Sequence, residues 1–121
     1  MKGDNASGRW GEEKASQYLK LRGWQIVERN YACRFGEIDL IASRGAVLAF
    51  VEVKTRKDKS HGEAREFVTA AKQRRLLLSA EAYLASHETQ RQPRFDVIEI
   101  YAPQGERTLF PKIVHLENAF E

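Results

Sequence analysis

The sequence is short of the features that mark secreted and membrane proteins. It contains one cysteine, Cys33, which has no partner for an internal disulfide and no neighbours that complete a zinc ligand set. No hydrophobic run approaches the roughly 20 residues that a membrane-spanning helix needs. Residues 1–7 also lack the hydrophobic segment of a signal peptide. We therefore expect a cytoplasmic protein without a membrane partner.

Internal repeats, low-complexity tracts and interdomain linkers are missing as well, so we expect a single domain over residues 1–121. The hydrophobic content of 42% and the charged content of 31% exclude a disordered chain and allow a buried core. The net charge of +3 is by itself weak evidence for a nucleic-acid partner. His61, His87 and His115 lack metal-ligand spacing, and we expect loop or surface positions for them.

The hydrophobic pattern of the first half predicts one helix and three strands. Apolar residues recur at helical spacing over residues 8–22, and Gly23 is typical of a helix end. Alternating or apolar segments then predict strands over residues 24–30, 37–43 and 46–56, with a connection at 31–35 and a turn at 44–45. Because these three strands follow one another directly, we expect an antiparallel meander.

The second half predicts a crossover helix and two more strands. Residues 57–66 are polar and read as a loop, and residues 69–86 carry the apolar stripe of a long helix. Residues 94–101 alternate as a strand, and residues 108–116 read as an edge strand. The order predicts an α/β fold with a mixed sheet, in which the helix brings strand 94–101 back parallel to its neighbour. The core should span residues 8–101.

Three charged residues, Asp39, Glu52 and Lys54, interrupt the apolar strands. Side chains alternate along a strand, so Glu52 and Lys54 project to one face while Val51 and Val53 project to the other. Ionised groups are costly in a buried strand unless something pairs them. Two carboxylates beside an ammonium indicate a divalent-metal site, in which the carboxylates hold Mg²⁺ or Mn²⁺ and the lysine faces a water.

A purely structural account of the same residues stays open. Glu52 with Lys54, and Asp39 with Arg56, would then form ion pairs in a small interaction protein. Buried ion pairs contribute little to stability, but removing one partner leaves the other charge buried without compensation, which is strongly destabilising.

Cations flank the acidic strands on both sides, as a polyanion held near a metal requires. We select Arg56, Lys57, Lys59, Lys72, Gln73 and Arg75 as candidates for nucleic-acid contact. Lys72 and Gln73 follow the acidic strand on the long helix. A solvated helix face explains Arg75 equally well.

The arrangement of a carboxylate on one strand and Glu-x-Lys on the next resembles the active site of the PD-(D/E)xK nucleases, which share the restriction-endonuclease-like fold. Residues 36–42 read GEIDLIA, residues 50–56 read FVEVKTR, and residues 94–97 read RFDV. Together with Gly11-Glu12 in the first helix, they resemble the UPF0102 or YraN-like family of predicted bacterial endonucleases. That family is regarded as distantly similar to archaeal Holliday junction resolvases.

The resemblance implies a role for each matching residue. Asp39 would ligate the metal and bridge it to the scissile phosphate, and Glu52 would be the second ligand together with the backbone carbonyl of Val53. Lys54 would orient or help deprotonate the attacking water. Glu12 matches a helix-borne glutamate of resolvase-like relatives and would complete the catalytic set. An acidic residue favoured by the dipole in the first turn of a helix is the alternative for Glu12.

The resemblance thus implies a metal-dependent endonuclease that hydrolyses phosphodiester bonds of nucleic acid, with DNA favoured, and it leaves open whether cleavage is specific for branched or junction DNA. A module that binds nucleic acid on a nuclease-like fold without cutting it is the alternative. Junction resolvases act as dimers because two strands are cut symmetrically, so a homodimer stays open.

Overall fold

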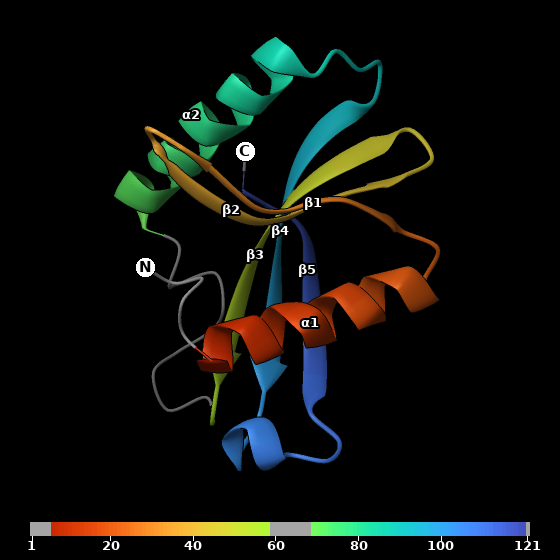
Figure 1. Ribbon diagram of the computed structural model, residues 1–121, viewed down its shortest axis with the longest axis vertical. Coiled ribbons are helices and arrows are strands. Elements are labelled where there is room, and N and C mark those ends of the chain that lie inside the picture. The colour runs from red at the N-terminus through yellow and green to blue at the C-terminus, as the bar shows by residue number, and fades with distance from the viewer. Residues whose placement is uncertain (1–5, 59–68, 121) are drawn as a thin grey trace.

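The computed structural model describes residues 6–58 and 69–120, with side chains from residue 8 onward. Its elements are α1 (Ala6–Leu21), β1 (Gln25–Cys33), β2 (Gly36–Arg44), β3 (Val47–Arg56), α2 (Ala70–Ser86), β4 (Gln92–Tyr101), the short 3₁₀ helix η3 (Gly105–Arg107) and β5 (Lys112–Phe120) (Figure 1). Lys59 and most of the predicted loop 57–66 lie outside the described residues. No helix in the described part of the chain is long and apolar enough to cross a membrane.

The strands form one sheet in the order β1-β2-β3-β4-β5. β1, β2 and β3 are antiparallel neighbours, β4 returns parallel to β3 after α2, and β5 is antiparallel to β4. This confirms the predicted α/β fold, a meander of three antiparallel strands plus a crossover strand. It is a restriction-endonuclease-like arrangement.

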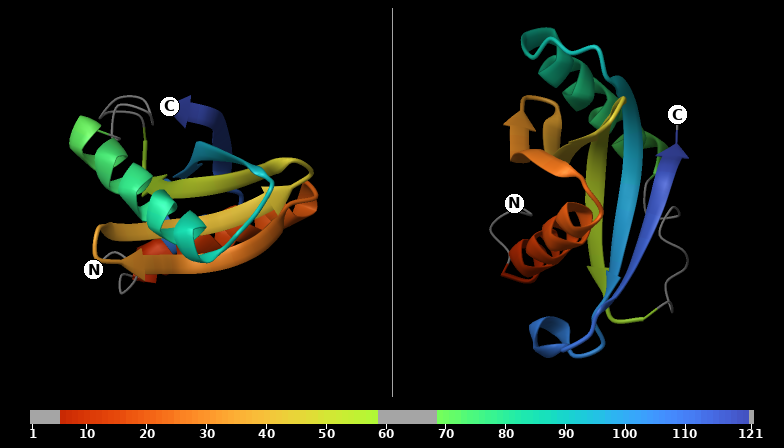
Figure 2. Two further views of the ribbon diagram at one scale, coloured as in Figure 1. Left: turned by 90° about the horizontal axis from the view of Figure 1, so that it is seen from above. Right: turned by 90° about the vertical axis from the view of Figure 1, so that its right-hand side faces the viewer.

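The two long helices cover opposite faces of the sheet (Figure 2). Ala15 and Leu19 of α1 pack with Val51 on one face, whereas Leu76 and Tyr83 of α2 belong to the cluster on the other. β3 is therefore apolar on both faces, as a strand between two layers must be. Where α1 ends, Gly23 takes a positive φ of 87° and its amide bonds the Lys20 carbonyl, a Schellman-type end that confirms the predicted stop.

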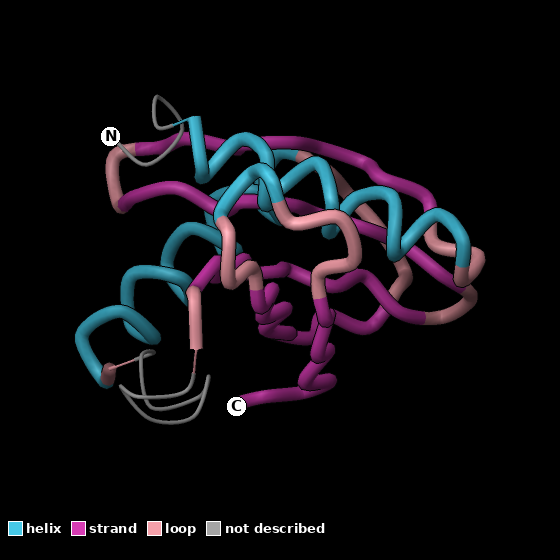
Figure 3. The backbone as a smooth tube through the Cα atoms, turned by 90° about the horizontal axis from the view of Figure 1, so that it is seen from below, coloured by secondary structure: helices cyan, strands magenta, loops and turns pink. Residues whose placement is uncertain are grey.

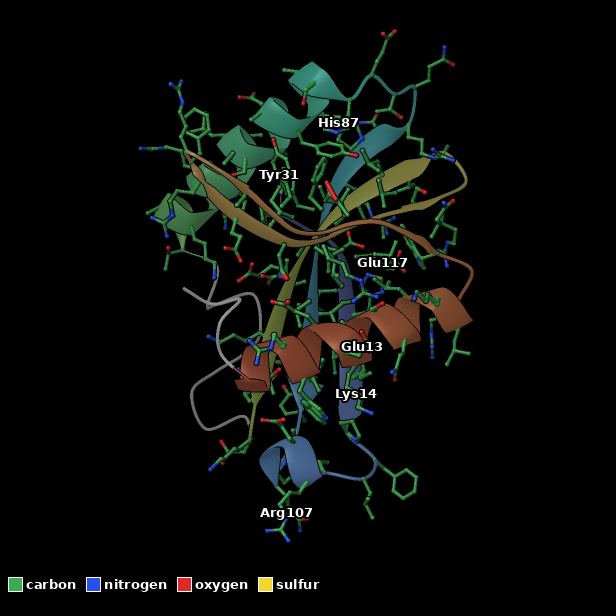
Figure 4. The ribbon with its side chains drawn as sticks, in the orientation of Figure 1. Glu13, Lys14, Tyr31, His87, Arg107 and Glu117 are labelled. Atoms are coloured by element: carbon green, nitrogen blue, oxygen red, sulfur yellow. The ribbon has the colours of Figure 1, made fainter. Side chains whose placement is uncertain are left out.

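Two strand boundaries differ from the expectation. β1 continues to Cys33, which pairs with Gly36, so the predicted connection 31–35 shrinks to a two-residue turn. Tyr31, labelled in Figure 4, lies in this added segment, and its ring packs edge-on against Tyr83 of α2 with centroids 5.3 Å apart, a contact that favours the longer strand.

The last strand is displaced along the chain from the predicted residues 108–116. β5 begins at Lys112, which pairs with Tyr101, and it extends to Phe120. The Phe120 ring stacks on Phe95 with centroids 5.1 Å apart. This contact between the end of β5 and the start of β4 has no signal in the local sequence.

Candidate active site

The site forms where β2 separates from β3. The two strands pair from Arg44 and Val47 at their turn as far as Leu40 and Val51. Past this point β2 continues beside β1, whereas β3 continues beside β4. Figure 1 shows the β1–β2 arm bending towards α2 while β3 extends towards η3. Asp39 and Glu52 are the first residues on β2 and β3 past the separation.

Asp39 is fully buried, with 1% of its surface exposed. Its Oδ2 accepts a hydrogen bond of 2.7 Å from the backbone amide of Val53. The carboxylate therefore takes the place of a cross-strand acceptor at the point where the ladder stops. This contact also brings Asp39 next to the residue whose carbonyl is the third predicted metal ligand.

Glu52 is buried on the α2 face of β3. The Lys72 ammonium in the first turn of α2 forms an ion pair with its Oε2. That turn is fixed by Thr69, whose side chain caps the helix by accepting a hydrogen bond from the Lys72 amide. Lys72, predicted as a phosphate contact, is thus positioned as a counter-charge for a predicted metal ligand.

Lys54 lies two residues beyond Glu52 on the same face and is half-buried. Arg56 follows on that face, and its guanidinium forms a buried ion pair of 2.9 Å with Glu99 of β4. The hydroxyl of Tyr101 donates a hydrogen bond to the same carboxylate, and the Arg56 guanidinium lies 5.3 Å from the Tyr101 ring centre. Arg56 therefore joins β3 to β4, a position that favours a supporting role over direct phosphate contact.

Glu12 approaches the separation point from the α1 face, with 5% of its surface exposed. The side-chain amide of Asn30 donates a 2.8 Å hydrogen bond to its Oε1. Asn30 lies across from Asp39 in the β1–β2 ladder and adopts a positive φ of 50°, a conformation that asparagine tolerates better than most residues. Sequence reasoning missed Asn30; an asparagine inside a strand-forming segment was the available signal.

Close packing of α1 on β3 makes this approach of Glu12 feasible. A Cβ atom on Gly11 would lie 2.0 Å from the Thr55 side-chain oxygen, so a larger residue there would force the Thr55 side chain or the helix to move. Glu12 follows directly and is carried towards the sheet.

The donor set fits a cation that needs few protein ligands. Within the described residues, no group of three or more His, Cys, Asp or Glu side chains is arranged to hold a metal ion. Mg²⁺ is commonly held by one or two carboxylates together with waters and substrate phosphates. The Asp39 and Glu52 carboxylates and the Val53 carbonyl match that mode, and the Lys72 ammonium shows that Glu52 accommodates a cation.

The remaining predicted contacts lie around this centre. Lys57 is exposed at the end of β3, Arg75 is exposed on α2, and Gln73 is half-buried beside Lys72. The structure thus brings Asp39, Glu52, Val53 and Lys72 together and leaves Arg75 on an outer helix surface.

Asp96 belongs to a separate, structural network. Its buried carboxylate accepts hydrogen bonds of 2.9 Å from Arg94 and contacts His115 Nε2 at 2.7 Å, while the Asn118 amide donates at 3.0 Å. Burial alone would raise the pKa of Asp96, but these hydrogen bonds and the Arg94 charge lower it below its ordinary value. His115 is therefore buried in this network, and the surface position expected for it was wrong.

One family model and several proteins of that family are similar to this sequence. The model of "Uncharacterised protein family UPF0102" matches residues 11–100. A UPF0102 protein of Syntrophotalea carbinolica is 44% identical over 115 residues, which are 94% of this chain and 90% of that protein. One of Caldanaerobacter subterraneus is 45% identical over 93% of both chains. One of Symbiobacterium thermophilum is 51% identical over 77% of this chain and 80% of its own.

Proposed function

The chain belongs to the UPF0102 family, whose description assigns no activity, and from its own residues we propose that it is a metal-dependent endonuclease that hydrolyses phosphodiester bonds. The observation that carries the proposal is the burial of the Asp39 and Glu52 carboxylates where β2 separates from β3, with Lys54 next along the same strand face.

Asp39, Glu52 and the Val53 carbonyl would hold Mg²⁺ or Mn²⁺. The ion, when bound, would polarise the phosphodiester and lower the pKa of a bound water. Lys54 would orient that water and stabilise the charge that develops on the phosphate. Asn30 would hold the Glu12 carboxylate, which approaches the same point from the α1 face.

The substrate proposed is nucleic acid, with DNA favoured. Lys57 supplies exposed positive charge at the end of β3, beyond the carboxylates, and Arg75 adds exposed charge on the outer surface of α2. Such cations would contact phosphates without reading sequence, which agrees with recognition by the shape of a branched substrate.

A module that binds nucleic acid without cutting it is the second candidate. The ion pair between Lys72 and Glu52 favours it, because it neutralises the carboxylate without a metal. A protein in which this pair persists would bind phosphates through its cations and leave them intact.

A cleavage assay separates the two candidates. Labelled duplex, single-stranded, flap and four-way-junction DNA are incubated with Mg²⁺, Mn²⁺ or EDTA, using the wild type, Glu52→Gln and the exposed-helix control Glu81→Gln. Endonuclease activity predicts metal-dependent products that Glu52→Gln loses by 10²-fold or more, on the order of one lost electrostatic contact in a transition state, and that Glu81→Gln retains. Binding without products favours the module, and equal cleavage by Glu52→Gln contradicts the proposed site.

A further inference from the structure

Two of the three most exposed large apolar side chains in the described part of the chain are neighbours in the sequence. Leu109 is 83% exposed and Phe110 is 92% exposed, in the loop between η3 and β5. Single exposed apolar residues are ordinary on a protein surface, but an aromatic ring almost completely in water, at the tip of a loop, favours a contact with a partner. Figure 1 shows η3 and its flanking loops at one end of the sheet, and Figure 3 views the molecule from that end.

Positive charge surrounds the Phe110 ring. A pocket of about 360 Å³ is lined by Lys57, Asp58, Tyr101, Pro103, Phe110 and Lys112. A second pocket beside it shares Lys57 and Pro103 and adds Arg107, which is labelled at the tip of the molecule in Figure 4. Three cations thus line the two adjoining pockets, the first of which contains the Phe110 ring, and the nearby carboxylates are those of Asp58 and of Glu106 beside Arg107.

The pocket opens on the face of the sheet that carries the proposed active site. Arg56 pairs with Tyr101, and Tyr101 pairs with Lys112, so these three side chains share the face of Glu52 and Lys54. Lys57 is three residues beyond Lys54, about 10 Å along an extended strand. About three stacked nucleotides cover that distance at 3.4 Å each.

We propose that Phe110 stacks on an unpaired base of the substrate while Lys57, Arg107 and Lys112 contact the phosphates of the same strand. The inference rests on the proposed nuclease function and narrows its substrate to nucleic acid with a single-stranded segment beside the cut. An exposed aromatic ring near cations suits single-stranded nucleic acid, because the bases offer flat apolar faces for stacking and the phosphate backbone offers negative charge. An apolar protein surface would leave the three cations unpaired.

The test measures binding without cleavage. In a Glu52→Gln background with EDTA, Kd is measured for a forked DNA with a fluorescent adenine analogue at the first unpaired position, and for the matching blunt duplex. Phe110→Ala should weaken binding to the fork roughly tenfold or more, the usual effect of removing a stacked aromatic ring, and abolish quenching of the analogue. Binding to the blunt duplex should not change. Phe110→Trp should retain both signals, and Leu109→Ala is the matched control.

A phosphate contact has a different signature. Lys112→Ala should reduce the slope of log Kd against log salt concentration by about one on fork and duplex alike, whereas Phe110→Ala should leave the slope unchanged.

Three results would overturn the inference. The first is equal affinity of Phe110→Ala and the parent for the fork. If the enzyme with Glu52 intact still shows metal-dependent cleavage, this result rejects the stacking site and leaves the proposed nuclease function in place. A shift from dimer to monomer in Phe110→Ala would instead assign the ring to a second copy of the chain. Failure of the parent to bind any of the DNAs would reject the stacking site and the proposed function together.

Discussion

Replacing Asp39 separates the structural work of this carboxylate from its proposed role as a metal ligand. Asp39 Oδ2 accepts the hydrogen bond of the Val53 amide at 2.7 Å, in a fully buried position. Asp39→Asn keeps a carbonyl oxygen in place for that amide but removes the negative charge. Asp39→Ala removes both the oxygen and the charge.

The two variants should therefore differ in stability without metal. Asp39→Ala leaves a buried backbone amide without this acceptor, a loss of about 1–3 kcal/mol. For a domain of this size each kcal/mol lowers the melting midpoint by about 3–6 °C. Asp39→Asn should stay within about 1 kcal/mol of the wild type, since loss of a buried charge removes its desolvation cost.

Metal should separate both variants from the wild type, including Asp39→Asn, which is close to it in EDTA. A ligand at 100 times its Kd stabilises the folded state by about 2.7 kcal/mol, so Mn²⁺ should raise the melting midpoint of the wild type and of the control Glu81→Gln. Both Asp39 variants should lose that increase. Calorimetric melts in EDTA and in Mn²⁺, followed by titration calorimetry, measure the two effects on the same samples.

Two results would refute this reasoning. If Asp39→Asn is as unstable as Asp39→Ala in EDTA, the charge and not the hydrogen bond is what the fold requires, as the ion-pair account expects. If Mn²⁺ raises the midpoint of Asp39→Asn as much as that of the wild type, Asp39 is not a metal ligand.

Three further changes test the surrounding residues. Asn30→Gly should melt closer to the wild type than Asn30→Ala, because glycine tolerates the positive φ, while both lower cleavage by releasing Glu12; equal midpoints would contradict the backbone argument. Lys72→Ala should show a larger Mn²⁺-induced rise in midpoint than the wild type, because the ammonium competes with the metal for Glu52; an equal rise would contradict this competition. Because its pKa is lowered in the folded protein, the ionised Asp96 carboxylate stabilises the fold at pH values above its unfolded-state pKa of about 4. This stabilisation is lost as the pH falls through the folded-state pKa. Acid titration of Asp96→Asn, followed by circular dichroism, should therefore show a flatter loss of stability below about pH 5, and an unchanged profile would remove Asp96 from the acid transition.

The sequence predicted the parts of the fold that depend on local periodicity. In β3, alternation and burial on both faces follow from residues such as Phe50 and Val51, which belong to the clusters on the α2 and α1 faces respectively. The end of α1 at Gly23 follows from the backbone freedom of one residue. The prediction that Asp39 and Glu52 lie on paired strands needed only the short turn between β2 and β3.

Features held by contacts between distant segments were not predictable in the same way. β1 reaches Cys33 because Tyr31 packs on Tyr83 of a helix far along the chain, and β5 reaches Phe120 because that ring stacks on Phe95. Within the site, the partners of the predicted residues were missed for the same reason. The pairing of Arg56 with Glu99 depends on the register of β3 against β4, which no local pattern fixes.

The position of Asp39 follows from a requirement of the backbone. Where β2 leaves β3, an amide of β3 loses the acceptor that a continuing ladder would provide, and a buried amide without an acceptor is costly. The Asp39 carboxylate supplies the acceptor but adds a buried negative charge next to that of Glu52, and two such charges attract a cation. Lys72 already provides one at Glu52. Strand separation therefore generates both the structural hydrogen bond and the cation-binding potential, so a structural role for Asp39 is no argument against a catalytic one.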